Sequence, residues 1–170
     1  FAVGLGPWRL GDPVTAERDG FDALVHLDAL DPFSALTVDV GNPHTVVALP
    51  QAVDLDAVDL TSSPAVRPEP PHGTNVEIVR PMGPGHIAMR VHERGVGETR
   101  SCGTGACAAA IATSFWAGSL DTGSTWLVDV PGGGLTVRLL AEQGVGLAGP
   151  AALVADGVID LAHLSVREQP

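Results

Sequence analysis

The residue whose surroundings best suit catalysis is Cys102. It lies in the stretch ETRSCGTGAC (residues 98–107), just before an alanine-rich segment, and two neighbouring glycines leave backbone N–H groups open to approach. Such N–H groups and the positive end of a helix dipole favour anions, and they lower a cysteine pKa from about 8.5 to roughly 3.5–7.5. We therefore expect Cys102 to supply a thiolate base. The alternative is a small cysteine that only fills a turn.

Cys107 is expected to pack in the core rather than to react. With Ile111 and Phe115 it forms an i, i+4, i+8 stripe, which is typical of one buried helix face. Five residues along a helix correspond to a rotation of about 140° and a rise of about 7.5 Å, so the two thiols point in different directions. They should neither form a disulfide nor flank one substrate carbon.

Five polar residues are candidates to converge on Cys102. Asn42 and His44 stand in VGNPH, where the intervening proline holds Asn42 extended and so fixes where its amide points. His44 is the best acid–base partner among the six histidines. Glu93 and Arg94 end a strand, where Arg94 can hold a carboxylate with two hydrogen bonds, and Asn75 opens another strand. Each also has a plainer interpretation as a turn residue, a structural histidine or a solvated ion pair.

Composition excludes several function classes. The chain has 9 basic and 20 acidic residues, and every basic one is arginine, so it offers no lysine for a Schiff base and no cationic stripe for nucleic acid or an anionic membrane. No spacing of histidine, cysteine and carboxylate residues matches a metal site, and we expect neither metal nor cofactor. No apolar run approaches the roughly 18 residues of a membrane span, and no secretory signal is present, which predicts a cytoplasmic protein.

Short apolar segments broken by glycine and proline predict an antiparallel β protein. The predicted helix is 105–116, whose part AAAIATSFW (108–116) is the one long stretch with helical propensity and without glycine or proline. This segment is apolar nearly all round, so we expect a β-barrel-like sheet wrapped around one central helix. A short surface helix is predicted at 54–60 and an exposed loop at 61–73. The predicted strands are 22–27, 35–40, 45–49, 76–79, 87–92, 125–130, 135–140 and 152–155. Because the chain opens at Phe1 without a methionine, we also expect it to be part of a longer polypeptide.

Three motifs together resemble a known family. GNPH at 41–44, NVE at 75–77 and HERGVGETRSCGTGACAAA at 92–110 are similar, in order and spacing, to the C-terminal half of diaminopimelate epimerase. The resemblance implies an α+β (α/β) fold in which two pseudo-symmetric halves flank a cleft. Residues 1–170 would then be a single domain, with the N-terminal half absent from this chain.

The resemblance also implies an activity and roles for residues. The family interconverts LL- and meso-diaminopimelate without pyridoxal phosphate or metal, on the bacterial route to lysine and peptidoglycan. Cys102 would be one of two acid–base cysteines, and His44 and Glu93 would help to set its protonation. The backbone amides of Gly103 and Thr104 would bind the α-carboxylate. The distal end of the substrate would be held by Asn42, Asn75, Glu93 and Arg94.

The second catalytic cysteine of the family belongs to the absent half. We therefore expect this polypeptide alone to be inactive, with activity restored by the other half in cis or in trans, and a homodimer is left open. A proline racemase-like enzyme on the same fold and a non-catalytic half that serves as a binding or assembly module are the alternatives. A cysteine hydrolase with His44 as base also stays open, although no oxyanion hole is visible in the sequence. The reactivity of Cys102 toward a thiol probe distinguishes a catalytic cysteine from a non-catalytic one.

Overall fold

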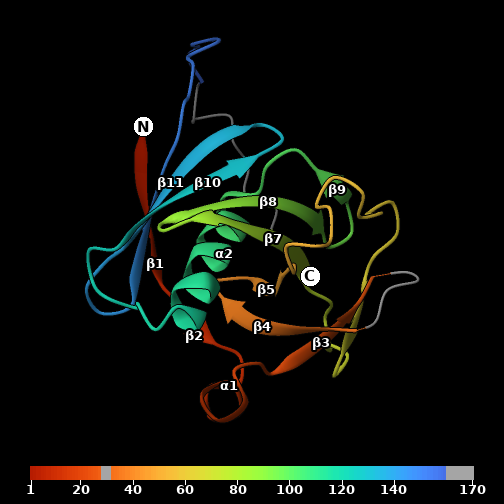
Figure 1. Cartoon of the computed structure of the whole chain (residues 1–170). Coiled ribbons are helices and arrows are strands. Elements are labelled where there is room, and N and C mark those ends of the chain that lie inside the picture. Colours follow the sequence, from red (N-terminus) through yellow and green to blue (C-terminus); the bar gives the residue numbers. More distant parts are fainter. Residues whose placement is uncertain (28–31, 160–170) are drawn as a thin grey trace, which may run out of the picture.

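The computed structural model describes residues 1–27 and 32–159, in which a curved sheet wraps around one long helix, α2 (Figure 1). The described residues contain two helices, α1 (Pro13–Asp19) and α2 (Gly103–Trp116), and one sheet of twelve strands. The strands are β1 (Ala2–Pro7), β2 (Arg9–Leu10), β3 (Ala23–His26), β4 (Phe33–Asp39), β5 (Pro43–Ala48), β6 (Ala65–Arg67), β7 (Asn75–Gly83), β8 (His86–Glu93), β9 (Gly97–Thr99), β10 (Thr125–Val130), β11 (Gly133–Leu139) and β12 (Gly144–Ala148). The predicted sheet-dominated α+β fold around a central helix is confirmed.

The sheet is mixed and open rather than an all-antiparallel barrel. Its strands run in the order β1-β12-β11-β10-β8-β7-β5-β4-β3-β6, with β2 beside β4 and β9 beside β8. No pairing among the described strands closes β1 onto β6. The antiparallel expectation is corrected at two places, because β5 pairs with β7 and β8 with β10 in parallel. Parallel neighbours need long crossovers, and here residues 49–74 provide the first and the segment that contains α2 provides the second.

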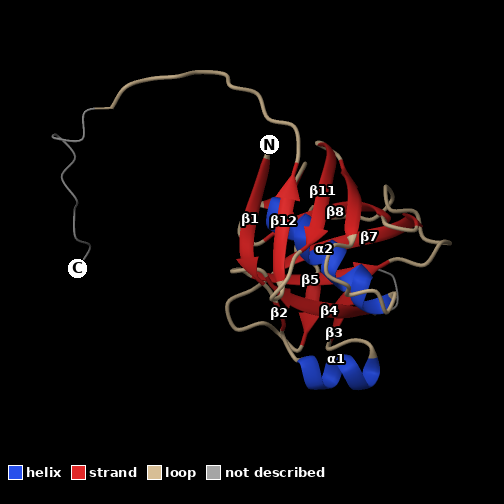
Figure 2. Cartoon of the chain, turned by 90° about the vertical axis from the view of Figure 1, so that its left-hand side faces the viewer, coloured by secondary structure: helices blue, strands red, loops and turns tan. Residues whose placement is uncertain are grey.

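Helix α2 runs through the interior because its surface is apolar nearly all round. Every residue from Gly105 to Ala112 is buried, and the short alanine side chains let strands pack closely against the helix. Figure 2 shows strands on several sides of this helix. This main core also contains residues from β4, β5, β7, β8, β10, β11 and β12. The predicted helix is confirmed and begins two residues earlier than expected. No helix in the described residues has the length and apolarity that crossing a membrane requires.

A second core lies on the other face of the sheet, and it overturns the predicted surface helix at 54–60. That segment forms turns, and Leu55, Val58 and Leu60 are buried against β3, β4, β5 and β7. The guanidinium group of Arg90 donates hydrogen bonds to the carbonyl groups of Leu55, Asp56 and Val58. Those carbonyls are therefore engaged by a side chain rather than by the i+4 amides of a helix.

Seven of the eight predicted strands match β3, β4, β5, β7, β8, β10 and β11 within a few residues. The eighth prediction, at 152–155, is wrong, because this segment is exposed and leaves the sheet without pairing in the described structure (Figure 2). The predicted loop at 61–73 contains the short strand β6, which pairs with β3. Strands β1 and β12 were not predicted because glycine breaks up their apolar pattern.

Helix α1 was also not predicted, although the sequence carries its boundaries. Asp12 caps the helix by accepting a hydrogen bond from the Thr15 amide, Pro13 occupies its first turn, and Gly20 ends it with a positive φ of 82°. The helix is only 7 residues long and buries only Ala16. Its apolar pattern is therefore too short to reveal it.

Shortening a buried side chain of α2 should cost far more than the same change on the surface. Ile111 is fully buried in the main core, so Ile111→Ala is expected to lower the free energy of unfolding by about 2–5 kcal/mol. The control is Val14→Ala on α1, where the valine is 73% exposed, and the expected change is within about 0.5 kcal/mol. Urea unfolding followed by circular dichroism measures both, and equal losses would contradict the interior position of α2.

Candidate active site

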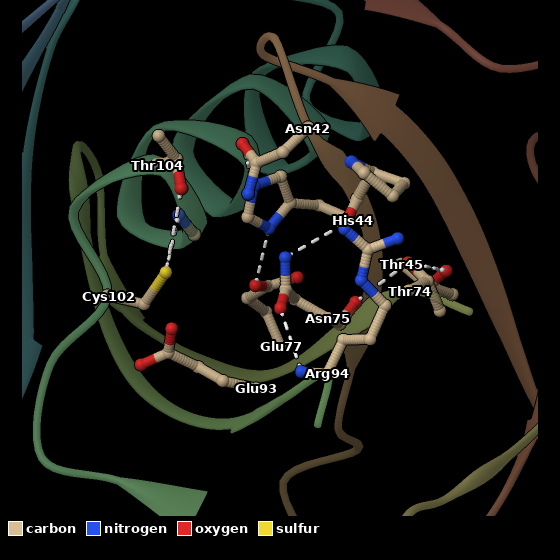
Figure 3. A network of polar contacts seen from close by, with 12 residues as sticks. Asn42, His44, Thr45, Thr74, Asn75, Glu77, Glu93, Arg94, Cys102 and Thr104 are labelled. Carbon is tan, nitrogen blue, oxygen red and sulfur yellow. Dashed lines mark hydrogen bonds and ion pairs between the residues drawn. The ribbon is translucent and has the colours of Figure 1, made fainter. Parts of the chain in front are cut away.

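Polar side chains of the sheet gather at the start of α2. Alternate residues of a strand point to the same face, so Asn75 and Glu77 of β7 share the face that packs on the helix. His44 of β5 is in register with Asn75, and Glu93 ends the neighbouring strand β8. Further along these strands the same face is apolar and covers α2. The buried helix therefore has a polar entrance, which begins at Cys102 (Figure 3).

Cys102 is the N-cap of α2, as the sequence predicts. Its Sγ accepts a hydrogen bond from the Gly105 amide at 3.4 Å and lies 3.6 Å from Thr104 Oγ1, and the residue is only 8% exposed. The first N–H groups of a helix have no intrahelical acceptor. The amides of Gly103 and Thr104 are therefore available to an anion at this helix end.

The thiol of Cys102 is not acidified in this chain, which corrects the sequence-based expectation. Burial raises its pKa, because a thiolate is poorly stabilised away from water. Hydrogen bonds from Thr104 and Gly105 lower the pKa in part, and the carboxyl groups of Glu77 and Glu93 raise it further. Desolvation and two acidic neighbours thus raise the pKa of Cys102 despite its two hydrogen bonds.

His44 is held at both ring nitrogens. Its Nδ1 lies 2.7 Å from Glu77 Oε1, and its Nε2 lies 3.0 Å from Asn42 Oδ1 (Figure 3). An amide oxygen only accepts hydrogen bonds, so Nε2 is the donor in the contact with Asn42, and Nδ1 faces the Glu77 carboxyl group. Asn42 and His44, two of the predicted residues, are thus brought together by the turn that contains Pro43.

Glu77 is the member of this group that the sequence analysis missed. It is fully buried, and burial raises the pKa of its carboxyl group, an effect that His44 partly opposes. Its second oxygen, Oε2, has no hydrogen-bond partner in the described part of the chain. The sequence does contain an indication of Glu77. It stands two residues after Asn75, so the two side chains share one face of a strand whose neighbouring residues are apolar.

Asn75 holds backbone in place. Its Nδ2 donates to the Pro43 carbonyl at 3.0 Å, and its Oδ1 accepts from the Arg94 amide at 2.9 Å. The side chain thus ties the turn before His44 to the end of β8. It fixes the relative positions of two other predicted residues.

Arg94 and Glu93 point to different sides of this group. The Arg94 guanidinium donates to the His72 carbonyl at 2.7 Å and borders a hollow of about 550 Å³ that also includes the proline-rich loop. Figure 3 shows Arg94 and Cys102 on opposite sides of His44 and Asn75. Glu93 accepts a hydrogen bond from the Thr99 hydroxyl, and its carboxyl group acts on Cys102. The predicted residues therefore form an elongated group with Cys102 at one end and Arg94 at the other.

Cys107 packs as predicted. It is fully buried with Ile111 in the main core, and burial raises its pKa to about 12. Among the described residues, no group of three or more histidine, cysteine and acidic side chains is placed to hold a metal ion.

The comparisons with known proteins agree with one another. The family model described as "Diaminopimelate epimerase" matches residues 36–154. A diaminopimelate epimerase of Streptomyces coelicolor is 48% identical over 137 residues, which cover 76% of this chain and 46% of that protein. One of Thermobifida fusca is 40% identical over 165 residues, covering 95% of this chain and 53% of that protein. The chain thus spans about half the length of these relatives.

A solved structure shares the fold. The crystal structure of a hydroxyproline epimerase from Agrobacterium vitis, with bound trans-4-hydroxy-L-proline, superposes with a TM-score of 0.58 at 16% identity. The match covers 86% of this chain and 47% of that one. At this identity the likeness concerns the fold alone.

Adding a methyl group at Gly105 should disturb the site. A Cβ there would stand 2.6 Å from Glu77 Oε1 and 3.2 Å from Cys102 Sγ, so Gly105→Ala must displace the Glu77 carboxyl group from His44. We expect a loss of about 1–3 kcal/mol in unfolding free energy, despite the better helix propensity of alanine. Urea unfolding measures it. Gly83→Ala, where the added Cβ meets open space, is the control, and a Gly105→Ala variant as stable as this control would contradict the close contact.

The two cysteines should differ in alkylation. Iodoacetamide reacts with thiolates, so the raised pKa of Cys102 predicts a rate midpoint above the value of about 8.5 for a free cysteine in the 170-residue chain. Cys107 should react only after unfolding, because it is fully buried and its pKa is about 12. Peptide mass spectrometry across a pH series separates the two sites. A Cys102 midpoint below pH 8, or Cys107 modified in the folded chain, would show that these environments are wrong.

Proposed function

The chain belongs to the diaminopimelate epimerase family, and from this we propose that it is one half of a cofactor-independent amino-acid epimerase that interconverts LL- and meso-diaminopimelate. The observation that carries the proposal is the cysteine at the entrance of a buried helix, surrounded by His44, Glu77 and Glu93. Acid–base chemistry at a carbon centre needs a titratable group next to an anion-binding site. Such a reaction would belong to bacterial lysine and peptidoglycan synthesis.

In the proposed reaction the substrate α-carboxylate binds to the amides of Gly103 and Thr104. The helix end would stabilise the negative charge that this carboxylate gains when the α-proton leaves, which is where preorganised N–H groups contribute most. Cys102 would exchange a proton at the α-carbon from one side. His44 and Glu93 would set the protonation state of Cys102. Neither pyridoxal phosphate nor a metal is needed for this proton transfer.

The distal end of the substrate is assigned to the other end of the polar group. Arg94 would bind the distal carboxylate, with Asn42 lining the path between the two ends. Glu93, which the resemblance also assigns to the distal end, lies on the Cys102 side of the group and would act there. Asn75 would act through the backbone positions that its amide holds. A separation between Cys102 and Arg94 suits a long substrate with an amino-acid group at each end (Figure 3).

We propose that the complete site includes a second half, in cis or in trans. Inversion at carbon needs an acid and a base on opposite faces, and Cys107 is buried in the core where no substrate reaches it. Two observations support the second half. The relatives are about twice as long, and the extended segment after β12 leaves Leu153, Val154 and Ile159 exposed, as expected for a segment that packs on another unit.

Hydrogen–deuterium exchange at the α-carbon tests the proposal. The protein with both halves should exchange the α-proton of LL-diaminopimelate in deuterated water and form the meso isomer, whereas Cys102→Ala should lose at least about a hundredfold in rate. The 170-residue chain alone should form no meso isomer. NMR of the substrate measures the exchange, and Cys107→Ala is the matched control.

Three outcomes would count against the proposal. Exchange in Cys102→Ala at the parent rate would remove the cysteine from the mechanism. Turnover of proline or hydroxyproline instead of diaminopimelate would indicate a racemase on the same fold. An intact protein with no exchange on any of these amino acids would indicate a non-catalytic module.

A further inference from the structure

Arg90 of β8 is a largely buried arginine that the candidate site does not use. Its side chain is only 14% exposed, and its guanidinium group makes five hydrogen bonds. Two go to the carboxylate oxygens of Glu98 on β9, at 2.7 and 2.9 Å. The other three go to carbonyl groups of the turn segment 54–60, at 2.7, 2.8 and 3.2 Å. Arg90 therefore joins three separate parts of the chain.

Strand β9 needs such a connection, because its own backbone bonds are few. It has only three residues and, among the described strands, it pairs with β8 alone. A ribbon this short is marginally stable without side-chain contacts. The contact between Arg90 and Glu98 uses both carboxylate oxygens, which fixes geometry as well as adding energy. It holds β9 at one position along β8.

Neighbouring residues of β9 point to opposite faces of the ribbon, because successive side chains of a strand alternate. Glu98 lies on the face of β8 that carries Arg90. Thr99 is in register with Val91, whose side chain belongs to the main core around α2. On that inner face, the Thr99 hydroxyl donates a hydrogen bond to Glu93 Oε1. The position that Arg90 fixes on the outer face thus also sets where the Thr99 hydroxyl lies on the inner face.

The inner end of this ribbon reaches the candidate site. Figure 3 shows the Glu93 carboxyl group on the Cys102 side of the polar group. Strand β9 ends at Thr99, three residues before Cys102. The chain between them is held again where the Arg100 carbonyl accepts a hydrogen bond from the Gly132 amide at 2.8 Å. A shift of β9 would therefore move the partner of Glu93 and the approach to Cys102 together.

We propose that Arg90 is a positioning residue: it fastens β9 through Glu98, so that Thr99 holds the Glu93 carboxyl group beside Cys102. The inference rests on the proposed function, because the place of this carboxyl group matters only if Cys102 exchanges a proton with a substrate. Arg90 itself lies on the other face of the sheet and acts through β9. Lysine cannot replace it, because an ammonium group lacks the planar fork that binds two carboxylate oxygens.

The first test is Arg90→Lys in the protein that contains both halves. Lysine keeps the charge but loses the fork, so we expect kcat to fall about tenfold and KM to stay within about threefold. Arg80→Lys is the matched control. Arg80 of β7 donates to the Val53 carbonyl, close to the same turn segment, and has no bond to β9. Its variant should keep kcat within about twofold of the parent.

The second test asks whether the effect passes through Glu93. Thr99→Val removes the hydroxyl group at nearly constant size and should lower kcat about fivefold to tenfold, whereas Thr99→Ser keeps the hydroxyl group and should stay within about twofold. In a Glu93→Ala background, Arg90→Lys and Thr99→Val should each change the remaining rate by less than about twofold, because the group that they position is gone. NMR of α-proton exchange measures these slow rates. A purely structural role would lower the rate by the same factor in both backgrounds.

Amide hydrogen exchange tests the connection without any substrate. Arg90→Lys should make the amides of 97–101 exchange at least about tenfold faster, and Arg80→Lys should leave them unchanged. The Thr99 variants decide the case in which Arg90→Lys does not fold.

The outcomes separate this inference from the proposed function. Parent kcat in Arg90→Lys, equal losses with and without the Glu93 carboxyl group, or unchanged amide exchange would each overturn the role of Arg90. A parent protein that exchanges no α-proton would refute the proposed function and, with it, the catalytic part of this role. Faster amide exchange in Arg90→Lys would then still show that Arg90 fastens β9.

Discussion

The structure depends on an apolar helix whose first turn must lie among polar groups. Helix α2 is buried along most of its length, so its N–H groups at the start cannot all be satisfied by water. Cys102 caps one of them, and the strands around this end carry His44, Asn75 and Glu77 where the rest of the inner face carries apolar side chains. The same arrangement leaves a helix end whose free amides suit an anion. The site is therefore a consequence of the way in which the core is closed.

The pKa of Cys102 at this helix end depends on whether the helix N-terminus or burial and neighbouring charges have the larger effect. A helix N-terminus stabilises a nearby anion by a limited amount, typically about 0.3–1 kcal/mol and up to about 2 kcal/mol in partly buried sites. Burial and the two acidic neighbours act in the opposite direction, and together they raise the pKa of Cys102. An argument from the helix alone predicts that the pKa of Cys102 is lowered. This is the wrong direction, because the argument omits groups that the fold brings from other strands.

Rigid connections keep this group in place. Asn75 joins the turn of Pro43 to the backbone of Arg94, and Glu77 and Asn42 hold the two edges of the His44 ring. None of these contacts requires a substrate. Loss of one member should therefore change the orientation of others, and the group is better regarded as one network than as separate binding residues.

The sequence alone determined the central helix, seven strands, the different environments of Cys102 and Cys107, and the family. These features follow from local patterns: helical propensity, alternation, and motifs in a fixed order. Tertiary structure decided the rest. The parallel pairs depend on where crossovers pass, the segment 54–60 depends on carbonyl groups that Arg90 engages, and β1 and β12 depend on partners far along the chain. The raised pKa of Cys102 depends first on its burial and then on Glu77 and Glu93. These two residues lie 25 and 9 residues before it in the chain, and their charges act through space and not along the sequence.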